Sequence, residues 1–343
     1  MKKLRVLLLT HPDLVPPDSL KGATEQEVQT WKTEYDVVST LRGRGHEVMP
    51  LGVDTELRPI RQAVESFKPH VVFNLLEEFH GEAVYDHSVV SYLELLRVPY
   101  TGCNPRGLVL ARGKDTAKKL VHYHRVPTPA FAVFPIGRKV VRPPRLQLPL
   151  IVKSLIEDAS MGIAQASVVE TDEALAERVA FIHERIGTSA IAEQYIEGRE
   201  IYVGVLGNER RRVLPIWELE FRSLAAGTRP IATERAKHDP DYQERRGVFQ
   251  GPAQDVPPAL RAQINAMVKR ICRTLEIDGY VRVDFRLGGD GVPYFIEANP
   301  NPEIAQNDEF AQSALHDGLS YPDLLNRIIA LGLSRTGSIG ERS

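Results

Sequence analysis

The sequence predicts an α/β unit followed by α+β units, and three observations carry this prediction. Short aliphatic runs alternate with helical patterns over the first third of the chain, which is typical of a doubly wound parallel sheet. A proline-rich stretch at 138–149 marks a linker or an irregular edge. Near the C-terminus, two strand-like segments flank the sequence Gly288-Gly-Asp-Gly, which predicts a β-hairpin.

In the first third, the aliphatic run at 6–9 predicts a buried strand. Gly43 and Pro69 mark the ends of two helical patterns, because glycine and proline both terminate helices. Strands are predicted at 6–9, 46–51, 70–75 and 98–101, and helices at 25–42, 60–67 and 88–97.

The other elements follow the proline-rich stretch. Strands are predicted at 150–154, 164–169, 190–196, 200–206, 280–287 and 292–298, and helices at 172–186, 259–275 and 322–331. The length of the chain predicts two or three packed units, and we expect the tail at 334–343 to be frayed.

Composition excludes several classes of protein. The 43 Lys and Arg nearly balance the 45 Asp and Glu, so charge gives no argument for a nucleic acid or an anionic membrane as partner. Two cysteines are too few for a disulfide framework in 343 residues. The sequence contains no run of 18 apolar residues, so it predicts no transmembrane helix, and we expect a cytoplasmic protein.

The hairpin carries the strongest chemical signal. If Gly289-Asp290 is a two-residue loop, Arg282 lies opposite Glu297. The apolar face then holds Val281, Val283, Phe285, Leu287, Val292, Tyr294, Ile296 and Ala298. The other face holds Arg282, Asp284, Arg286, Phe295, Glu297 and Asn299.

Asp284, Glu297 and Asn299 converge on one surface in this arrangement. Two carboxylates and an amide oxygen are hard ligands of the kind that Mg²⁺ prefers. The alternative is a solvated hairpin face with ordinary ion pairs. The continuation Asn299-Pro-Asn-Pro favours the metal site, because two prolines fix an irregular loop beside it.

These two segments, YVRVDFRL at 280–287 and YFIEANP at 294–300, resemble the metal-binding end of the ATP-grasp superfamily, and more closely its D-alanine–D-alanine ligase family. Further blocks match that family in order: VVFNLL at 71–76, YLELLRVPYTG at 92–102, PTP at 127–129 and PLIVK at 149–153. An ordered series of blocks is more specific than any single motif.

The resemblance implies an ATP-grasp fold behind a Rossmann-like N-terminal domain at 1–103. Residues 104–189 would form the small subdomain that covers ATP, and 190–333 the subdomain with the metal site. The implied function is an ATP-dependent carboxylate–amine ligase that works through an acyl phosphate. Its cofactors would be ATP and Mg²⁺, two ions in number and replaceable by Mn²⁺. Its partners would be amino-acid or peptide substrates and a second copy of the chain.

The resemblance also implies roles for individual residues. Lys114, Lys153 and Lys237 match lysines at the nucleotide phosphates, and Arg282 matches an arginine beside the reacting phosphate. Glu193, Tyr195 and Ile196 lie in the hinge that holds adenine, and Glu200 matches the acid on the ribose hydroxyls. Asp284, Glu297 and Asn299 match the magnesium ligands. Ser160 lies in the glycine-rich loop, and Glu25, or alternatively Glu27, matches an acid of the catalytic network.

The sequence departs from the family at the substrate end. Ala159 replaces a serine and His238 a tyrosine of the catalytic network. Glu303 takes the position of a glycine, and Asp308 falls near a serine that binds the carboxylate of the second D-alanine. Acids at these positions, with Glu309 beside them, would repel an acceptor carboxylate. We therefore expect an acceptor other than D-alanine, either cationic or peptide-like.

Three alternatives stay open at this point. The chain could be a genuine D-alanine–D-alanine ligase of peptidoglycan synthesis, or a nucleotide-binding regulatory module without catalysis. His80 follows the strand at 70–75 and could face a substrate cleft, because ligands bind beyond the carboxyl ends of parallel strands. The other reading of His80 is an exposed loop residue.

Overall fold

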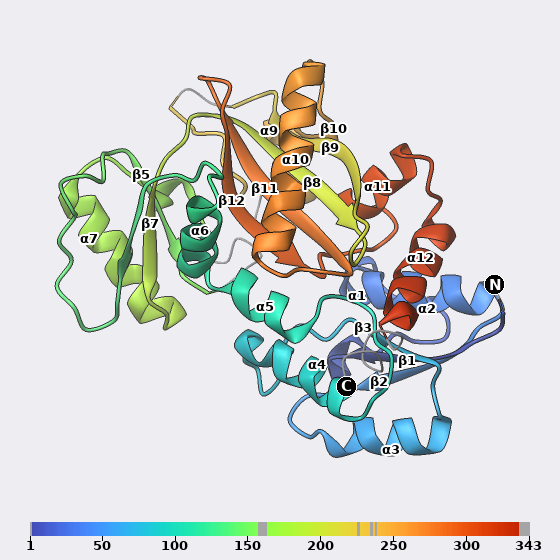
Figure 1. Cartoon of the computed structure of the whole chain (residues 1–343). Helices are drawn as coiled ribbons and strands as arrows, with labels where there is room; N and C mark the ends of the chain where they lie inside the picture. The colour runs from blue at the N-terminus through green and yellow to red at the C-terminus, as the bar shows by residue number, and fades with distance from the viewer. Residues whose placement is uncertain (1, 157–162, 225–226, 234–235, 237–238, 336–343) are drawn as a thin grey trace.

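The computed structural model describes residues 2–156, 163–224, 227–233, 236 and 239–335. Its elements form three units, each built on its own sheet (Figure 1). The blue and cyan N-terminal unit lies beside the green middle unit and the yellow-to-red C-terminal unit. This architecture confirms the mixed fold class. No helix in the described ranges has the length and apolar character needed to cross a bilayer.

The N-terminal unit contains a three-stranded parallel sheet in the order β2-β1-β3. Its strands are β1 (Arg5–Thr10), β2 (Glu47–Gly52) and β3 (Val71–Asn74). Its helices are α1 (Glu25–Thr30), α2 (Lys32–Gly43), α3 (Arg58–Phe67) and α4 (Asp86–Leu95), with short 3-10 turns at Pro12–Leu14 and Ala83–Tyr85. The strand predicted at 98–101 is wrong, because only a single bridge joins Tyr100 to Val72.

The last helix of the chain belongs in space to the first unit. α12 (Tyr321–Ser334) packs on α2 and β3. Its buried leucines and isoleucines share one core with Val6, Leu8 and Phe73 of the sheet. Figure 1 shows this red helix beside the blue segments. Burial of these apolar side chains holds the two ends of the chain together.

The middle unit contains a four-stranded sheet in the order β4-β7-β5-β6, with all three pairings antiparallel. The strands are β4 (Phe131–Phe134), β5 (Leu150–Ser154), β6 (Val168–Val169) and β7 (Ala190–Gln194). α7 (Asp172–Phe181) and the π-helical turn Ile182–Ile186 contribute to its core. The strand predicted at 164–169 is largely wrong, because Gln165–Ser167 forms a 3-10 turn. The sheet extends past residue 189 to Gln194.

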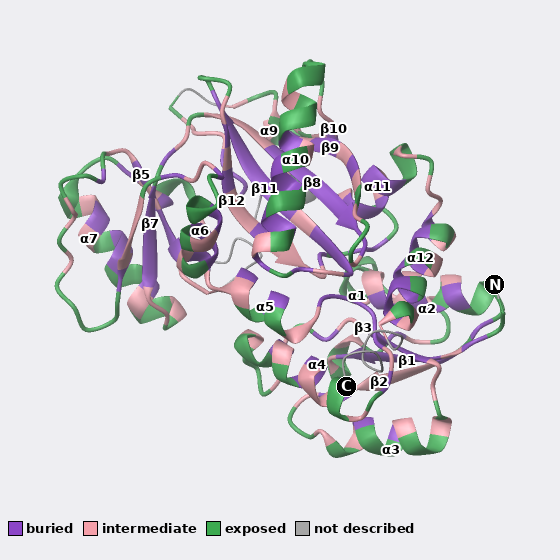
Figure 2. Ribbon diagram, in the orientation of Figure 1, coloured by how far each residue is buried: buried purple, intermediate pink, exposed green. Residues whose placement is uncertain are grey.

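The C-terminal unit contains a five-stranded antiparallel sheet in the order β10-β9-β8-β11-β12. The strands are β8 (Gly198–Leu206), β9 (Arg212–Phe221), β10 (Val248–Pro252), β11 (Tyr280–Gly288) and β12 (Pro293–Pro300). The helices of this part are α9 (Pro240–Arg246), α10 (Pro258–Thr274) and α11 (Glu309–His316). Figure 2 shows that buried residues concentrate along β8 and β11, at the centre of the sheet.

Two helices connect the first unit to this sheet and were not predicted from the sequence. α5 (Pro105–Arg112) packs on α4 and β12, and α6 (Lys114–Tyr123) packs on β12 and α10. Asn104 caps α5 by accepting a hydrogen bond from the Gly107 N–H at 2.9 Å. α6 begins at Lys114, and this start brings two of its lysines to the sheet edge.

Gly279 is required where the first unit meets the large sheet. Its φ is +72°, and an added Cβ would lie 2.2 Å from the carbonyl oxygen of Gly102. We expect Gly279→Ala to lower the free energy of unfolding by about 2–5 kcal/mol, from backbone strain and overpacking together. Gly289→Ala is the matched control, because that Cβ would have no atom within 4 Å. Equal midpoints for both variants in urea unfolding would contradict this account.

Candidate active site

A deep cleft opens between the middle unit and the large sheet. It encloses about 840 Å³ of empty space, including the solvent at its mouth. The middle unit lines it with Lys153 and Glu193, and the large sheet with Glu200, Asp284 and Glu297. The cleft therefore lies at the boundary that the sequence predicted for the nucleotide.

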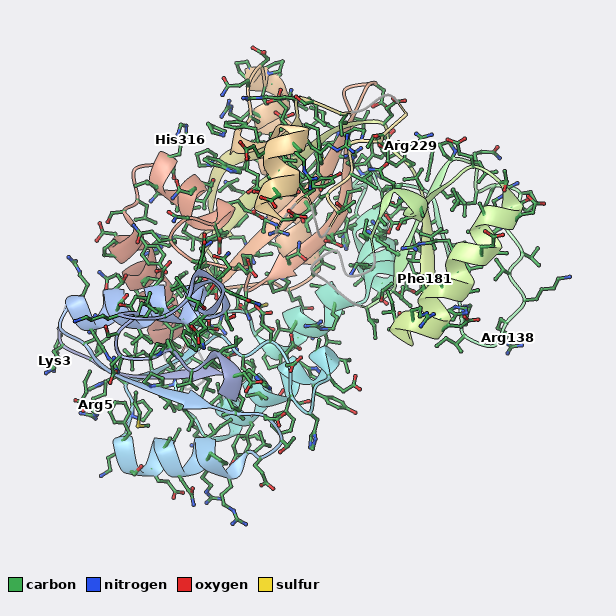
Figure 3. The ribbon with its side chains drawn as sticks, turned by 180° about the vertical axis from the view of Figure 1, so that it is seen from behind. Lys3, Arg5, Arg138, Phe181, Arg229 and His316 are labelled. Carbon is green, nitrogen blue, oxygen red and sulfur yellow. The ribbon has the colours of Figure 1, made fainter. Side chains whose placement is uncertain are left out.

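Arg229 makes a contact between the C-terminal unit and the middle unit. Arg229 precedes the cleft residues Ile231 and Ala232, and its guanidinium forms an ion pair with Glu170 at 2.5 Å. Figure 3 shows Arg229 at the junction of the two units and Arg138 at the outer end of the middle unit. The guanidinium also lies 5.0 Å from the ring centre of Tyr195.

The predicted register of the hairpin is wrong. Asp284 pairs directly with Glu297, and Arg282 pairs with Asn299 rather than with Glu297. The loop has three residues, Gly289 to Gly291, with Gly291 left-handed at φ +76°. Asp290 supports this turn by accepting a hydrogen bond from the Val292 N–H at 3.0 Å. A glycine in the left-handed region is what a three-residue hairpin loop requires.

A β-bulge also changes which side chains share a face. The register shifts between Asp284 and Phe285, where Ile296 is the extra residue on β12. Phe295 was expected on the polar face but lies fully buried in the core, opposite Phe285. Tyr294 was expected on the apolar face but pairs with Arg286 and donates to Asp290 at 2.9 Å. The bulge thus brings Glu297 opposite Asp284.

The three predicted metal ligands lie together at the edge of the cleft. The Asn299 amide donates to Oδ2 of Asp284 at 2.9 Å, and Glu297 pairs with Asp284 across the ribbon. An amide nitrogen and oxygen are assigned by their partners, so a rotated Asn299 would present its oxygen. The described residues contain no group of three His, Cys, Asp or Glu suited to a metal, and here the third ligand is an amide. Two carboxylates and an amide fit a divalent ion.

Arg282 connects the metal ligands to the start of α11. It donates from Nε and Nη2 to Asp284 at 2.8 and 2.9 Å, and from Nη1 to Glu309 at 2.5 Å. Burial alone would lower the pKa of Arg282, but the Asp284 and Glu309 carboxylates raise it well above its usual range. Its charge is therefore permanent and is held next to Asp284.

Lysines from two other elements approach Glu297. The Nζ atoms of Lys114 and Lys153 lie 3.8 and 3.9 Å from Oε2 of Glu297. Both lysines are buried at the wall of the cleft. Lys153 also lies 3.3 Å from Oε1 of Glu193. The structure thus brings together these two predicted phosphate lysines and the predicted metal ligands.

One charged residue behind this wall was not predicted from the sequence. Lys118 is fully buried, and its Nζ lies 3.4 Å from Oε1 of Glu193. Burial lowers the pKa of Lys118 to about 8, against the opposing effect of Glu193. A signal was available: Lys118 follows Lys114 by four residues, so a helix there places both on one face.

The predicted adenine hinge lies at the end of β7. The Tyr195 N–H donates to Pro149 at 3.0 Å, and the Ile196 carbonyl accepts from Nε of Arg286 at 3.1 Å. Burial raises the pKa of Tyr195, whose hydroxyl accepts a hydrogen bond from Arg286 at 3.1 Å. Arg286 also donates to Glu200 at 3.1 Å. Arg286 was not a predicted site residue, yet it orders this whole corner of the cleft.

The acids considered for the catalytic network lie on α1. Glu25 is exposed in the first turn of α1 and does not line the cleft described above. Glu27 is exposed too and accepts the Thr24 N–H at 2.8 Å as a capping box. Glu34 on α2 is instead buried and accepts from the Thr10 hydroxyl at 3.0 Å. Burial raises the pKa of Glu34.

Two of the acidic residues predicted near the acceptor form ion pairs with basic side chains. Nζ of Lys32 on α2 donates to Asp308 at 2.7 Å, and Glu309 accepts from Arg282 as described above. Burial raises the pKa of Asp308, and the Lys32 ammonium opposes that shift. Glu303 is exposed on the same loop. This loop therefore has the carboxylates of Glu303 and Asp308 at the positions where the family resemblance implies a glycine and a serine.

The other predicted residues divide into two groups. His80 is exposed with φ +60°, and its N–H donates to the carbonyl of Asp54 at 3.0 Å. It does not line the cleft. Ser160, Lys237 and His238 lie outside the described residues.

Comparison with known families gives a match over more than half of the chain. Residues 127–330 match the model of the D-alanine–D-alanine ligase C-terminus. The chain is 31% identical to the uncharacterized protein y4sG of Sinorhizobium fredii, over 89% of each chain. It is 30% identical to a D-alanine–D-alanine ligase of Desulfotalea psychrophila, over 80% of this chain and 82% of that protein.

Solved structures share the fold. The D-alanine–D-alanine ligase of Bacillus anthracis, complexed with ATP, superimposes with a TM-score of 0.76 at 20% identity. That match covers 99% of this chain and all of the other. The ligase of Coxiella burnetii gives a TM-score of 0.71 at 16% identity, over 99% of this chain and 97% of that one. At these identities the likeness establishes the fold.

Proposed function

The chain belongs to the D-alanine–D-alanine ligase family of ADP-forming ATP-grasp ligases, and we propose that it joins a carboxylate to an amine other than D-alanine, using ATP and Mg²⁺. The observation that carries this proposal is the pairing of Asp284 with Glu297 at the cleft edge, where Glu297 lies within 4 Å of two lysine ammonium groups. Small molecules, an amino acid or a short peptide, are the proposed substrates.

The proposed nucleotide site uses both walls of the cleft. Adenine would lie at Glu193, Tyr195 and Ile196, with Glu200 at the ribose. Lys114 and Lys153 would neutralise the phosphates, where positioning and charge account for most of the catalysis in phosphoryl transfer. We include Lys237, Ser160 and His238 in this proposal on the resemblance alone.

The divalent ion would be held by Asp284, Glu297 and Asn299, and when bound it neutralises charge on the phosphates. Mg²⁺ is proposed because the donors are all hard oxygens, and Mn²⁺ would accept the same set. Arg282 is proposed to face the reacting phosphate, since it already lies against Asp284. The permanent positive charge of Arg282 would attract the reacting phosphate, which stays anionic throughout the reaction.

The proposed reaction has two steps. A substrate carboxylate oxygen forms a bond to the γ-phosphorus, and ADP leaves. The acceptor nitrogen then attacks the acyl carbon of this acyl phosphate, inorganic phosphate leaves, and the nitrogen gives up its proton. A side-chain nucleophile has no part in this scheme. The first-domain acid of the network is proposed as Glu25 or Glu27.

The acceptor is proposed to be cationic or peptide-like. Asp308 falls near the serine that would hold an acceptor carboxylate, so this position already carries a carboxylate, which is held by Lys32, and the neighbouring Glu309 is held by Arg282. A second carboxylate there would meet repulsion, whereas an ammonium group would be attracted. Glu303 and His80 are proposed to contribute to the substrate end, outside the part of the cleft described above.

A panel of acceptor amines tests whether the acceptor is cationic or peptide-like. We expect ADP release with ATP and Mg²⁺ to be fastest when the amine donor is a diamine, a basic amino acid or a short peptide. D-alanine as the sole substrate should give a rate lower by roughly tenfold or more, because one misplaced charge contributes at least about 1.4 kcal/mol. Mass spectrometry of the product would confirm the new amide.

Two results would favour the alternatives. Full turnover with D-alanine alone would indicate a genuine D-alanine–D-alanine ligase of peptidoglycan synthesis. Tight nucleotide binding with no ADP release under any substrate mixture would indicate a regulatory module. A homodimer is also proposed from the family resemblance, and sedimentation of the purified chain measures it.

A further inference from the structure

Lys118 lies behind the cleft and has no role in the proposal above. Its side chain is fully buried on α6, where it faces β12. A buried ammonium is costly, because the charge loses its hydration, and an apolar side chain would fill the same space at lower cost. The contacts of Lys118 therefore need a reason other than packing.

These contacts converge on the bulge of β12. Nζ donates to the carbonyl of Ile296 at 2.5 Å and to that of Phe295 at 3.3 Å. Ile296 is the extra residue of the bulge, so its backbone lies outside the regular ladder with β11. Buried carbonyls need a donor, and Lys118 supplies one to two successive carbonyls.

The direction of Glu297 depends on this bulge. In a strand without the extra residue, Ile296 would lie opposite Asp284, and Glu297 would point to the other face. With the bulge, Glu297 pairs with Asp284. A bulge of this kind re-aims a side chain, and something must hold it in that form.

A second set of contacts involves the phosphate lysine. Glu193 is 1% exposed, and its Oε1 lies between the ammonium groups of Lys118 and Lys153 at 3.4 and 3.3 Å. Lys118 thus shares the Glu193 charge with Lys153. Without Lys118, Glu193 would attract Lys153 alone and would hold its ammonium group more firmly against the wall.

We propose that Lys118 is a positioning residue, which holds the bulge at Ile296 so that Glu297 faces Asp284, and which shares Glu193 so that Lys153 can turn to a nucleotide. This inference rests on the proposed function, because it assigns Glu297 and Lys153 to the metal and the phosphates. Lys118 itself touches neither substrate nor metal.

The test is nucleotide binding measured with and without Mg²⁺. The probe is the non-hydrolysable analogue adenylyl imidodiphosphate, titrated calorimetrically with Mg²⁺ and then with EDTA. In Lys118→Met we expect the Mg²⁺-dependent gain in affinity to fall roughly 10–100-fold, the usual effect of removing a partner that orients a metal ligand. Lys118→Arg keeps the charge and should recover part of that gain.

Lys119→Met is the matched control, because Lys119 is on the same helix, exposed and paired only locally with Asp115. Its Mg²⁺-dependent gain should equal that of the wild type. An equal loss of affinity in Lys118→Met with Mg²⁺ and with EDTA would show that Lys118 has no effect specific to the metal ligands, and it would overturn the assignment of the bulge to Lys118. An unchanged gain in that variant would overturn it as well.

A second variant covers the case in which Lys118→Met is unstable. If Lys118→Met does not fold, the double variant Lys118→Met, Glu193→Gln removes the buried acid that would be left with one partner. A wild-type gain in that double variant would contradict the proposal. If the wild type itself gains no affinity from Mg²⁺, the proposed function fails, and that result is separate from any effect of Lys118.

Discussion

Asp284→Asn is expected to abolish metal-dependent turnover, with a fall in ADP release of roughly 10²–10³-fold or more. The substitution keeps the shape of the side chain and removes its charge. A neutral amide is a weaker ligand for a divalent ion, and it no longer balances Arg282, which would keep only Glu309. The measurement is the rate of ADP release at saturating ATP across a series of Mg²⁺ concentrations.

Asp290→Asn is the control for this prediction. It makes the same chemical change in the same hairpin, at an exposed turn residue away from the cleft. Its rate should match the wild type. Glu297→Gln should behave like Asp284→Asn, since the two residues are paired across the ribbon. Retention of Mg²⁺-dependent turnover in Asp284→Asn would remove this residue from the metal site.

Lys153→Met is expected to have the second largest effect, on nucleotide affinity. A charge-assisted contact to phosphate is worth about 1.5–3 kcal/mol, so the dissociation constant for ATP should rise roughly 10–150-fold. Glu193 would keep Lys118 as a partner, so the fold should survive the change. Calorimetric titration with ATP and Mg²⁺ measures the affinity directly.

Lys139→Met serves as the matched control, because Lys139 is an exposed lysine of the same unit and does not line the cleft. It should bind ATP as the wild type does. If both variants bind equally well, Lys153 makes no productive contact with the phosphates. Loss of binding together with a large fall in the free energy of unfolding would indicate that Lys153 has a structural role instead.

The sequence predicted the nature of the hairpin better than its geometry. Alternation of side chains was enough to bring Asp284, Glu297 and Asn299 to one surface. The register, however, depends on the left-handed Gly291 and on the bulge at Ile296. A bulge depends on contacts from distant parts of the chain, here a lysine of α6, so strand periodicity alone does not reveal it.

Other elements were missed for local reasons. β9 contains Pro215, and proline argues against a central strand, yet β9 lies between β8 and β10. The register of β9 shifts beside Pro215, which accommodates the missing N–H. α5 had a readable start at Asn104 and Pro105, a cap followed by proline at the first helical position. The burial of Glu34 and Lys118 emerges only once the units pack together.

The central claim is that one β-ribbon holds a divalent ion at the nucleotide phosphates. A crystal structure with ADP and Mn²⁺ in place of Mg²⁺ tests it most directly, because Mn²⁺ is located by its anomalous scattering. We expect the anomalous peak within bonding distance, about 2.0–2.3 Å, of oxygens from Asp284, Glu297 and Asn299, with Lys114 and Lys153 turned to the phosphates. Nucleotide bound in the cleft with the peak elsewhere, and these three side chains unchanged, would contradict the account.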